Sequence, residues 1–335
     1  MKKIFLLILL SLCFGRVIFA QTKVGTTAAN FLTIPVGARA SAMGGAFTAD
    51  ANDVTAAYWN AAGLARLGKD EFTASFSNWI AGTKISWFGL SYQLDEDDAV
   101  GLSINQLNYG QEEITTTSQP NGTGQNWTAS DIALGLSYSR NLTDRFSVGG
   151  TVKYITQNIW NESASAFAMD IGLLFNTQLQ GLRIGMNITN FGTEMQLAGQ
   201  DLLIPGDINP SQTGNNKTIA ANLQTSSWPL PLVFTVGVGY DVLNNDTWGW
   251  TVESDAVYPN NQSGYLNLGT EVNWTKILYL RAGYFSLFKQ NVQGGLSAGI
   301  GIDYDFGAFY AKVDYGYTNF GIFDPINRIS VSIGL

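Results

Sequence analysis

The chain carries few of the side chains that catalytic chemistry uses. It has no histidine, and Cys13 is its one cysteine. A Ser-His-Asp triad, a Cys-His pair and a zinc site built on His or Cys are therefore excluded. The remaining candidates are charged residues that an alternating pattern, described below, places on the inner face of predicted strands: Lys153, Arg183, Glu253, Asp255, Glu271, Arg281, Asp303, Asp305, Lys312 and Asp314.

These inward charges allow two interpretations. Two carboxylates on such a face could perform acid–base chemistry, as they do in glycoside hydrolysis. Alternatively, the charges pair with one another and with Arg39, which precedes the predicted strands. We favour pairing, so we predict that the protein is not an enzyme and has no catalytic residue, no metal site and no cofactor.

Composition restricts the kind of surface that the chain presents. Its 335 residues are 45% hydrophobic and 13% aromatic, and only 13% are charged. Soluble domains carry roughly 25% charged residues, so a large assembly or a lipid bilayer must cover part of this surface. The formal net charge of −8 argues against nucleic acid as a partner.

The first twenty residues have the organisation of a secretory signal peptide. Lys2 and Lys3 precede an apolar run over residues 4–14, and Ala20 is a small residue at a suitable cleavage position. A transmembrane anchor is the alternative, but the run is well short of the ~20 residues that span a bilayer. We divide the chain into a signal peptide (1–20), an N-terminal segment (21–69) and a strand-rich region (70–335).

Alternation with a period of two dominates the strand-rich region. Near the chain end, for example, Ile329, Val331 and Ile333 alternate with serine and glycine. A soluble sandwich would carry Lys and Glu on its polar face, whereas small polar residues fit a barrel lumen whose outer face meets lipid. We therefore predict an all-β transmembrane fold, an outer-membrane antiparallel β-barrel. Aromatic residues near strand ends would form its interfacial girdles: Trp79, Trp87, Trp248, Trp250, Trp274, Tyr284 and Tyr317.

The barrel is predicted to have about fourteen strands, an even number that places both ends of the polypeptide chain on the periplasmic side of the membrane. The turns after even-numbered segments are all short, whereas those after odd-numbered segments include the long stretches 110–129 and 193–229. Short periplasmic turns and longer outer loops are typical of outer-membrane barrels. The segments are 71–79, 83–93, 99–109, 130–140, 145–158, 164–176, 182–192, 230–241, 247–258, 262–274, 277–287, 294–305, 308–319 and 326–335.

Residues 21–69 do not alternate, and they are rich in Ala and Gly. Such a segment could be a mobile linker, but a fourteen-stranded barrel has a lumen too wide for wall side chains alone to fill. We therefore predict a plug, or hatch, folded inside the barrel. A short helix is expected from about Asp53 to Trp59, capped by Asp50 or Asn52.

Two stretches of this segment are distinctive: residues 37–47 read GARASAMGGAF, and residues 58–64 read YWNAAGL. With Asn52-Asp53 and residues 25–32, they resemble the N-terminal signature of the PorV/PorQ proteins, relatives of the FadL long-chain fatty-acid transporters. The family pattern usually reads Asn-Pro-Ala-Gly, so Ala61 departs from it and lacks the stiffening that proline would give. The resemblance implies a FadL-like barrel whose hatch motif is Gly37, Arg39, Met43, Gly44, Gly45, Asn52, Asp53, Trp59, Asn60 and Gly63.

For PorV, the resemblance implies a role in type IX secretion. There the barrel collects exported substrates by their C-terminal domains at the translocon and presents them for surface attachment. FadL-like members instead let hydrophobic compounds leave the lumen sideways through a kinked strand. The leading hypothesis is therefore a secretion component of the bacterial outer membrane, and the alternative is a channel for hydrophobic small molecules.

The two hypotheses imply different partners. Both include outer-membrane lipid. Secretion implies other envelope proteins, namely the translocon and substrates with a C-terminal domain. A channel implies a hydrophobic small ligand, lipid or detergent in the lumen.

Two further features bear on this choice. In the third alternating segment, Asn105 and Gln106 stand where the alternation leaves room for one residue, which predicts a β-bulge. The bulge would be either a FadL-like lateral opening or an ordinary feature of a barrel. The long loops also carry apolar residues that would form a partner-binding surface or pack together as a lid: Leu202, Leu203, Ile204, Trp228, Phe320 and Phe323.

Overall fold

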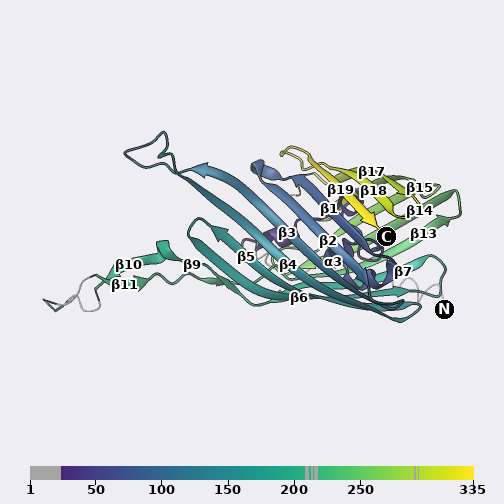
Figure 1. The fold of residues 1–335 in the computed structure, drawn as a ribbon, viewed down its shortest axis with the longest axis horizontal. Helices are drawn as coiled ribbons and strands as arrows, with labels where there is room; N and C mark the ends of the chain where they lie inside the picture. Colours follow the sequence, from purple (N-terminus) through teal and green to yellow (C-terminus); the bar gives the residue numbers. More distant parts are fainter. Residues whose placement is uncertain (1–23, 208–210, 213, 215–217, 290–291, 293) are drawn as a thin grey trace, which may run out of the picture.

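Fourteen antiparallel strands form one closed wall in the computed structural model (Figure 1). The structure describes residues 24–207, 211, 212, 214, 218–289, 292 and 294–335; the predicted signal peptide, residues 1–20, lies outside this part. The wall strands are β1 (Glu71–Asn78), β2 (Lys84–Gln93), β3 (Asp98–Glu113), β4 (Asn126–Thr143), β5 (Phe146–Ile159), β6 (Glu162–Asn176), β7 (Leu182–Gly192), β13 (Val233–Asn244), β14 (Trp248–Pro259), β15 (Tyr265–Trp274), β16 (Leu278–Leu287), β17 (Leu296–Asp305), β18 (Tyr310–Thr318) and β19 (Ile326–Gly334).

The predicted barrel and its number of strands are confirmed. Each of the fourteen alternating segments overlaps one wall strand. The wall closes where β1 pairs with β19, from Glu71 opposite Gly334 to Ser77 opposite Arg328, and we call this pairing the seam. No helix in the described part of the chain is long and apolar enough to cross a membrane.

The two ends of the barrel differ. Six short turns, from the β2–β3 turn to the β17–β18 turn, lie at one end, which we call the short-turn end. The opposite, long-loop end is uneven, because β3 and β4 extend well beyond the ends of the neighbouring strands (Figure 1). The connection from β7 to β13 also projects there. It contains β8 (Met195–Gln196), β9 (Ala198–Gly199), β10 (Leu203–Gly206), β11 (Ile219–Asn222) and β12 (Ser227–Trp228).

The outer face of the wall is apolar, as the alternation predicts. Leu102, Leu136 and Phe167 are among many large apolar side chains that remain exposed on it. The girdle prediction is wrong for two residues. Trp87 is buried inside the barrel against the N-terminal segment, and Trp79 packs edge-on against Phe320 of a long loop.

The bulge predicted at Asn105 and Gln106 is wrong. β3 keeps its register with both β2 and β4 through these two residues, and the irregularity lies further along, at residues 109–110. The alternation changes at Leu107 because this residue faces the lumen, where it belongs to an apolar cluster that includes Phe31. The inner face is therefore apolar at this level, and the continuous hydrogen-bond ladder leaves no lateral gap there.

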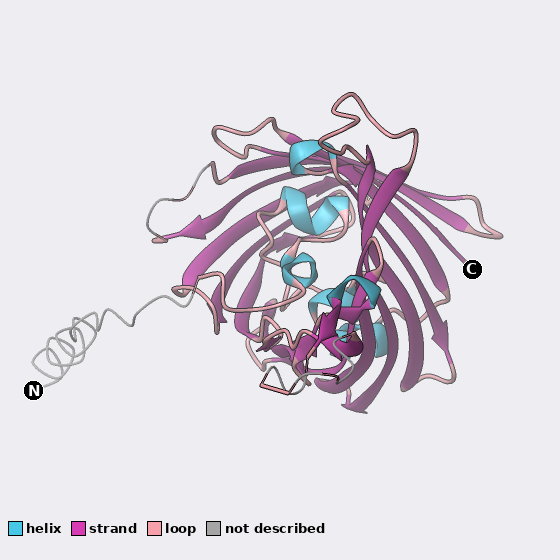
Figure 2. Ribbon diagram, turned by 90° about the vertical axis from the view of Figure 1, so that its left-hand side faces the viewer, coloured by secondary structure: helices cyan, strands magenta, loops and turns pink. Residues whose placement is uncertain are grey.

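The N-terminal segment fills the lumen, as predicted for a plug (Figure 2). It contains η1 (Asn30–Thr33), α2 (Ala38–Ala42), α3 (Ala56–Trp59) and η2 (Ala61–Arg66). The α3 helix begins three residues later than predicted. In the turn before it, the Asp53 carboxylate accepts from the backbone N–H of Thr55 (2.8 Å). Asp50 and Asn52, the predicted caps, instead contact Arg39.

The plug runs along the whole lumen. At the long-loop end, the backbone N–H of Ala28 donates to the carbonyl of Pro229 (2.9 Å), and Asn261 donates to the hydroxyl of Thr27 (2.8 Å). At the short-turn end, the chain leaves η2 and enters β1 at Glu71. The plug thus passes from one end of the barrel to the other.

Small wall residues let the plug backbone lie directly on the strands. A Cβ atom at Gly283 would lie 2.2 Å from the backbone nitrogen of Gly44, and one at Gly269 would lie 2.5 Å from the carbonyl oxygen of Met43. Gly44 itself has φ +68, which favours glycine, and its own Cβ would lie 2.6 Å from the Tyr284 nitrogen. The glycines on the inner face therefore form a surface fitted to the plug.

Candidate functional site

A network of charges around Arg39 joins the plug to the wall. The Arg39 guanidinium lies 2.8 Å from Glu271 of β15, 3.1 Å from Asp50 and 3.4 Å from Asp53. It also donates to Asn52 and lies 4.9 Å from the centre of the Phe47 ring. One side chain therefore holds α2, the following turn and the wall together.

Arg39 is one part of a longer chain of ion pairs. Glu271 also accepts from Arg281 of β16 (2.6 Å), and Arg281 pairs with Asp314 of β18 (2.6 Å). On the other side of the plug, Arg183 of β7 pairs with Asp50 (2.9 Å). The prediction that inward charges pair with one another and with Arg39 is confirmed for these residues. Asp305, by contrast, is exposed at the end of β17.

Wall carboxylates also accept hydrogen bonds from the plug backbone. Asp255 accepts from the N–H groups of Phe47 and Thr48, both at 3.0 Å, and Glu253 accepts from that of Ala49 (2.6 Å). These donors lie in a turn without helical hydrogen bonds, so the carboxylates supply partners that the segment lacks. The positions of Glu253 and Asp255 on β14 thus set the depth at which this turn sits.

Asn60 and Trp59 hold the second half of the plug. The Asn60 side chain donates to the carbonyls of Thr48 (2.8 Å) and Leu173 (3.0 Å), and its oxygen caps η2 by accepting from Ala62. Trp59 donates from Nε1 to the carbonyl of Val36 (3.1 Å).

The other residues of the predicted hatch motif lie inside the plug. Met43 is fully buried. The remaining three are glycines at close approaches: a Cβ at Gly63 would lie 1.8 Å from the Ala51 carbonyl oxygen, one at Gly37 would lie 3.0 Å from Thr55, and one at Gly45 would lie 3.2 Å from Asn267.

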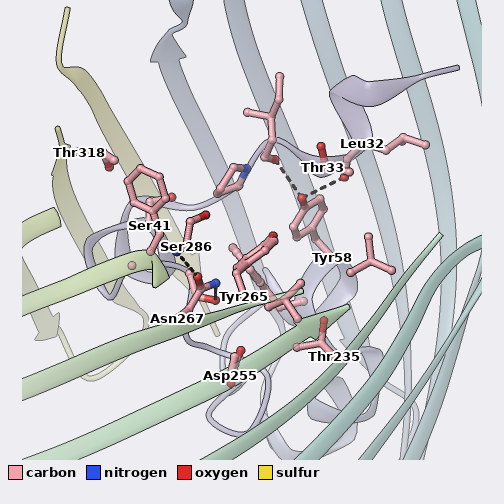
Figure 3. Close-up of a pocket in the computed structure, with 18 of the residues that line it drawn as sticks. Leu32, Thr33, Ser41, Tyr58, Thr235, Asp255, Tyr265, Asn267, Ser286 and Thr318 are labelled. Atoms are coloured by element: carbon pink, nitrogen blue, oxygen red, sulfur yellow. Dashed lines mark hydrogen bonds between the residues drawn. The ribbon is translucent and has the colours of Figure 1, made fainter. Parts of the chain in front are cut away.

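An outer cavity of about 500 Å³ lies between the plug and the long loops (Figure 3). Its mouth is aromatic: Phe320 stacks on Phe285 (ring centres 5.7 Å apart) and meets the edge of Trp79 (5.2 Å). Plug residues line its base. There Tyr58 donates to the carbonyls of Leu32 and Ile34, both at 3.0 Å, and burial raises the pKa of Tyr58 above its ordinary value.

An inner cavity of about 400 Å³ faces the short-turn end and is lined by charged residues, among them Arg39, Asp53, Lys69 and Asp303. The two cavities share no lining residue. Fully buried plug residues such as Phe47 separate them. The plug therefore lies between the two cavities.

The apolar loop residues fall into two groups. Leu203, Ile204 and Trp228 are exposed on the long-loop end, where β10 and β11 form a projecting hairpin. Leu202 precedes this hairpin and is half-buried. Phe320 instead closes the cavity mouth, as the lid interpretation expects, and Phe323 lies beside it and remains exposed.

Arg328 is a cavity residue that the sequence-based prediction missed. It lies on β19, lines the outer cavity and is 3% exposed. The alternating pattern of β19 could have identified it. Ile329, Val331 and Ile333 face outward, so Arg328 must face inward. The polar residues Ser41 and Asn187 also line this cavity and were not singled out.

The closed wall and the filled lumen define the class: this is a closed antiparallel β-barrel with an N-terminal plug, and its fold is FadL-like. Solved structures with this fold include the CymD monoaromatic hydrocarbon channel (12% identity, TM-score 0.53, covering 89% of this chain and 96% of that chain). The Pseudomonas putida toluene transporter TodX is similar (12%, 0.54, 89% and 97%), as is a Pseudomonas aeruginosa FadL homologue (14%, 0.51, 94% and 99%). At these identities the similarity is one of fold.

The family follows from the sequence. The family model described as type IX secretion system protein PorV matches residues 18–215. Because this match spans more than half of the chain, the chain belongs to the PorV family. No curated protein matches its sequence.

Proposed function

We propose that this protein is a non-enzymatic component of type IX secretion that binds exported substrates at the cell surface. The family to which the chain belongs supports a role in this system. The short turns would then face the periplasm and the long loops the cell exterior, as is typical of outer-membrane barrels. The binding surface for protein partners is the long-loop end.

The observation that carries the proposal is the plug that is fixed across the lumen between the two cavities. Ion pairs from Arg39 and Arg183 and backbone hydrogen bonds to Glu253 and Asp255 fix the plug across the barrel. Passage of a solute through this barrel would require many of these contacts to break together. A surface that binds partners needs no such rearrangement, so the plugged state is itself competent for binding.

The projecting hairpin offers a partner its apolar side chains. Leu203 and Ile204 are 53% and 39% exposed, and Trp228 nearby is 46% exposed. Aromatic and aliphatic groups of this kind anchor protein interfaces when a partner covers them. This supports the predicted partner-binding role of these loops.

The test is a deletion strain complemented with variants of the chain. We expect the deletion to stop release and surface attachment of proteins with a C-terminal secretion domain. Leu203→Asp combined with Ile204→Asp should fail to restore secretion and should no longer purify with such a substrate. Thr117→Asp, an exposed change in the loop between β3 and β4, is the matched control and should restore both. Normal secretion in the deletion strain would refute the proposal.

A second candidate function is a channel for hydrophobic small molecules. The outer cavity favours it, because aromatic side chains line its mouth, and two structures of similar fold are named as a hydrocarbon channel and a toluene transporter. If the protein is such a channel, the deletion strain will secrete normally and fail to take up a hydrophobic carbon source. The plug fixed across the lumen and the unbroken ladder at Asn105 and Gln106 count against this candidate.

A further inference from the structure

Arg328 differs from the other buried basic residues in this barrel. Among the described residues, Lys153, Arg281 and Arg328 are the basic residues with almost no exposure. Lys153 pairs with Asp170 (2.5 Å) and Arg281 with Glu271 (2.6 Å). In the same described part of the chain, Arg328 pairs with no carboxylate, and its Nη2 atom has no hydrogen-bond partner.

A buried guanidinium without a counter-ion is unfavourable, because burial removes its hydration and nothing replaces it. Arg328 could be avoided easily in this strand, where the other inward residues are Ser330 and Ser332. Its guanidinium instead lines the outer cavity, which opens toward the long loops. An anion that enters this cavity would supply the missing charge.

The same cavity contains polar atoms of other kinds. Asn187 donates to the Trp59 carbonyl, but its Oδ1 atom is buried and has no partner within the described structure. The Ser41 hydroxyl is also buried there and, within the same part of the chain, has no partner. The Asn187 oxygen can accept from a ligand N–H, and the Ser41 hydroxyl can donate or accept, so a ligand that carries both an anion and N–H donors would satisfy all three groups. A fatty acid or a hydrocarbon carries no such donor, whereas a polypeptide carries both.

The shape of the cavity favours the end of a chain. The plug closes its base, and a volume of about 500 Å³ is in the range of small-ligand sites. A chain end needs room for one extended strand, whereas a loop needs room for two. The aromatic mouth formed by Trp79, Phe285 and Phe320 suits apolar side chains next to that end.

We propose that the outer cavity binds the carboxyl-terminal end of a partner polypeptide, with its terminal carboxylate on Arg328 and its last, apolar side chains against the aromatic mouth. This inference rests on the proposed function, since it names how a secreted partner would be held. It assigns Arg328 as the residue that determines specificity for a free chain end.

The proposal is tested with purified protein in detergent and a fluorescein-labelled apolar pentapeptide, by fluorescence anisotropy. We expect the peptide with a free terminal carboxylate to bind at least about tenfold more tightly than the same peptide with a terminal amide, because a charge-assisted hydrogen bond is lost. Arg328→Met should remove this preference, and Arg328→Lys should keep part of it. Arg145→Met, an exposed change at the short-turn end, is the matched control and should bind like the parent protein.

Three binding results would overturn the proposal: equal binding of carboxylate and amide peptides, an Arg328→Met variant that keeps the preference, or displacement of the peptide by dodecanoic acid at equal concentration. A circular-dichroism spectrum of each variant shows whether the barrel has formed. Failure here is separable from failure of the secretion role. If Arg328→Met secretes normally while the Leu203→Asp and Ile204→Asp variant does not, the cavity proposal fails and the surface role stands.

Discussion

Replacing Arg39 by methionine should release the plug from the wall without unfolding the barrel. The change removes a charge that contacts Glu271, Asp50 and Asp53 while keeping most of the side-chain volume. The barrel itself is held by strand pairing around the whole wall, which this substitution does not touch. The expected effect is therefore local, on the free energy of detaching α2.

The free-energy cost of the substitution depends on which ion-pair partners the three carboxylates retain. Breaking a buried ion pair by removing one partner costs roughly 3–5 kcal/mol. Glu271 retains Arg281 and Asp50 retains Arg183, and the Arg39 side chain is 15% exposed, so the lower end of this range applies. A loss of about 3 kcal/mol raises the detached population about 100-fold, since each 1.4 kcal/mol corresponds to a factor of ten.

A buried thiol under the plug can report this population. Ser297 is fully buried on β17, and its hydroxyl donates to the Ala42 carbonyl of α2 (3.0 Å). Cys13 is the only native cysteine and lies in the predicted signal peptide, so Ser297→Cys gives the mature chain one labelling site. When the plug recloses faster than the thiol reacts, the rate of maleimide labelling follows the detached population.

We expect Arg39→Met to raise the labelling rate of Cys at position 297 by about 100-fold, in proportion to the detached population. Arg145→Met, at an exposed position, should leave the rate unchanged. A labelling rate for Arg39→Met within twofold of the parent would refute the reasoning, because it would mean that the ion pairs do not hold the plug.

Further changes test other contacts of the plug. Gly44→Ala should lower the stability of the folded barrel by about 3 kcal/mol, because the residue has a left-handed backbone and its new Cβ would clash with the wall. Gly239→Ala should be tolerated, since its Cβ would lie 3.5 Å from Ala49. Thermal unfolding of the two variants measures the difference. Ala61→Pro should stabilise by up to ~1 kcal/mol, because Ala61 is the first residue of η2 and Asn60 before it is extended; a lower midpoint in denaturant would contradict this. The free energy of unfolding should fall above pH ~10, because burial raises the pKa of Tyr58 and the folded state therefore favours the protonated phenol. The Tyr58→Phe variant should be less stable than the parent below that pH, and its stability should decline less steeply above it.

The wall was predictable because its environment has two distinct sides. Lipid outside and small residues inside impose a period of two, and all fourteen segments show it. The prediction failed where the inner side is not polar. Leu107 faces an apolar cluster, and Trp87 packs on the plug, so each looks like an outward residue in the sequence.

The presence of a plug could be predicted from the sequence, but its contacts with the wall could not. Its composition and its place before the strands indicated a filled lumen. Which carboxylate meets which backbone N–H depends on the depth and rotation of the plug, and no local pattern encodes these. The contacts of Asp255 with Phe47 and Thr48 join residues more than 200 positions apart. The short strands β8 to β12 were missed because segments of two to four residues carry too little periodicity.

The route of the plug has a consequence for how the barrel is assembled. The seam joins the first and last wall strands, and the plug contacts both: the Ala38 N–H donates to Ser330 of β19 (2.8 Å), and the Val54 N–H donates to Glu71 of β1 (3.3 Å). A segment that runs the length of the lumen is most easily placed while the wall is still open. The plug would then act as a template on which the two strands meet, and the last step of folding would both close the wall and enclose the segment that guided it.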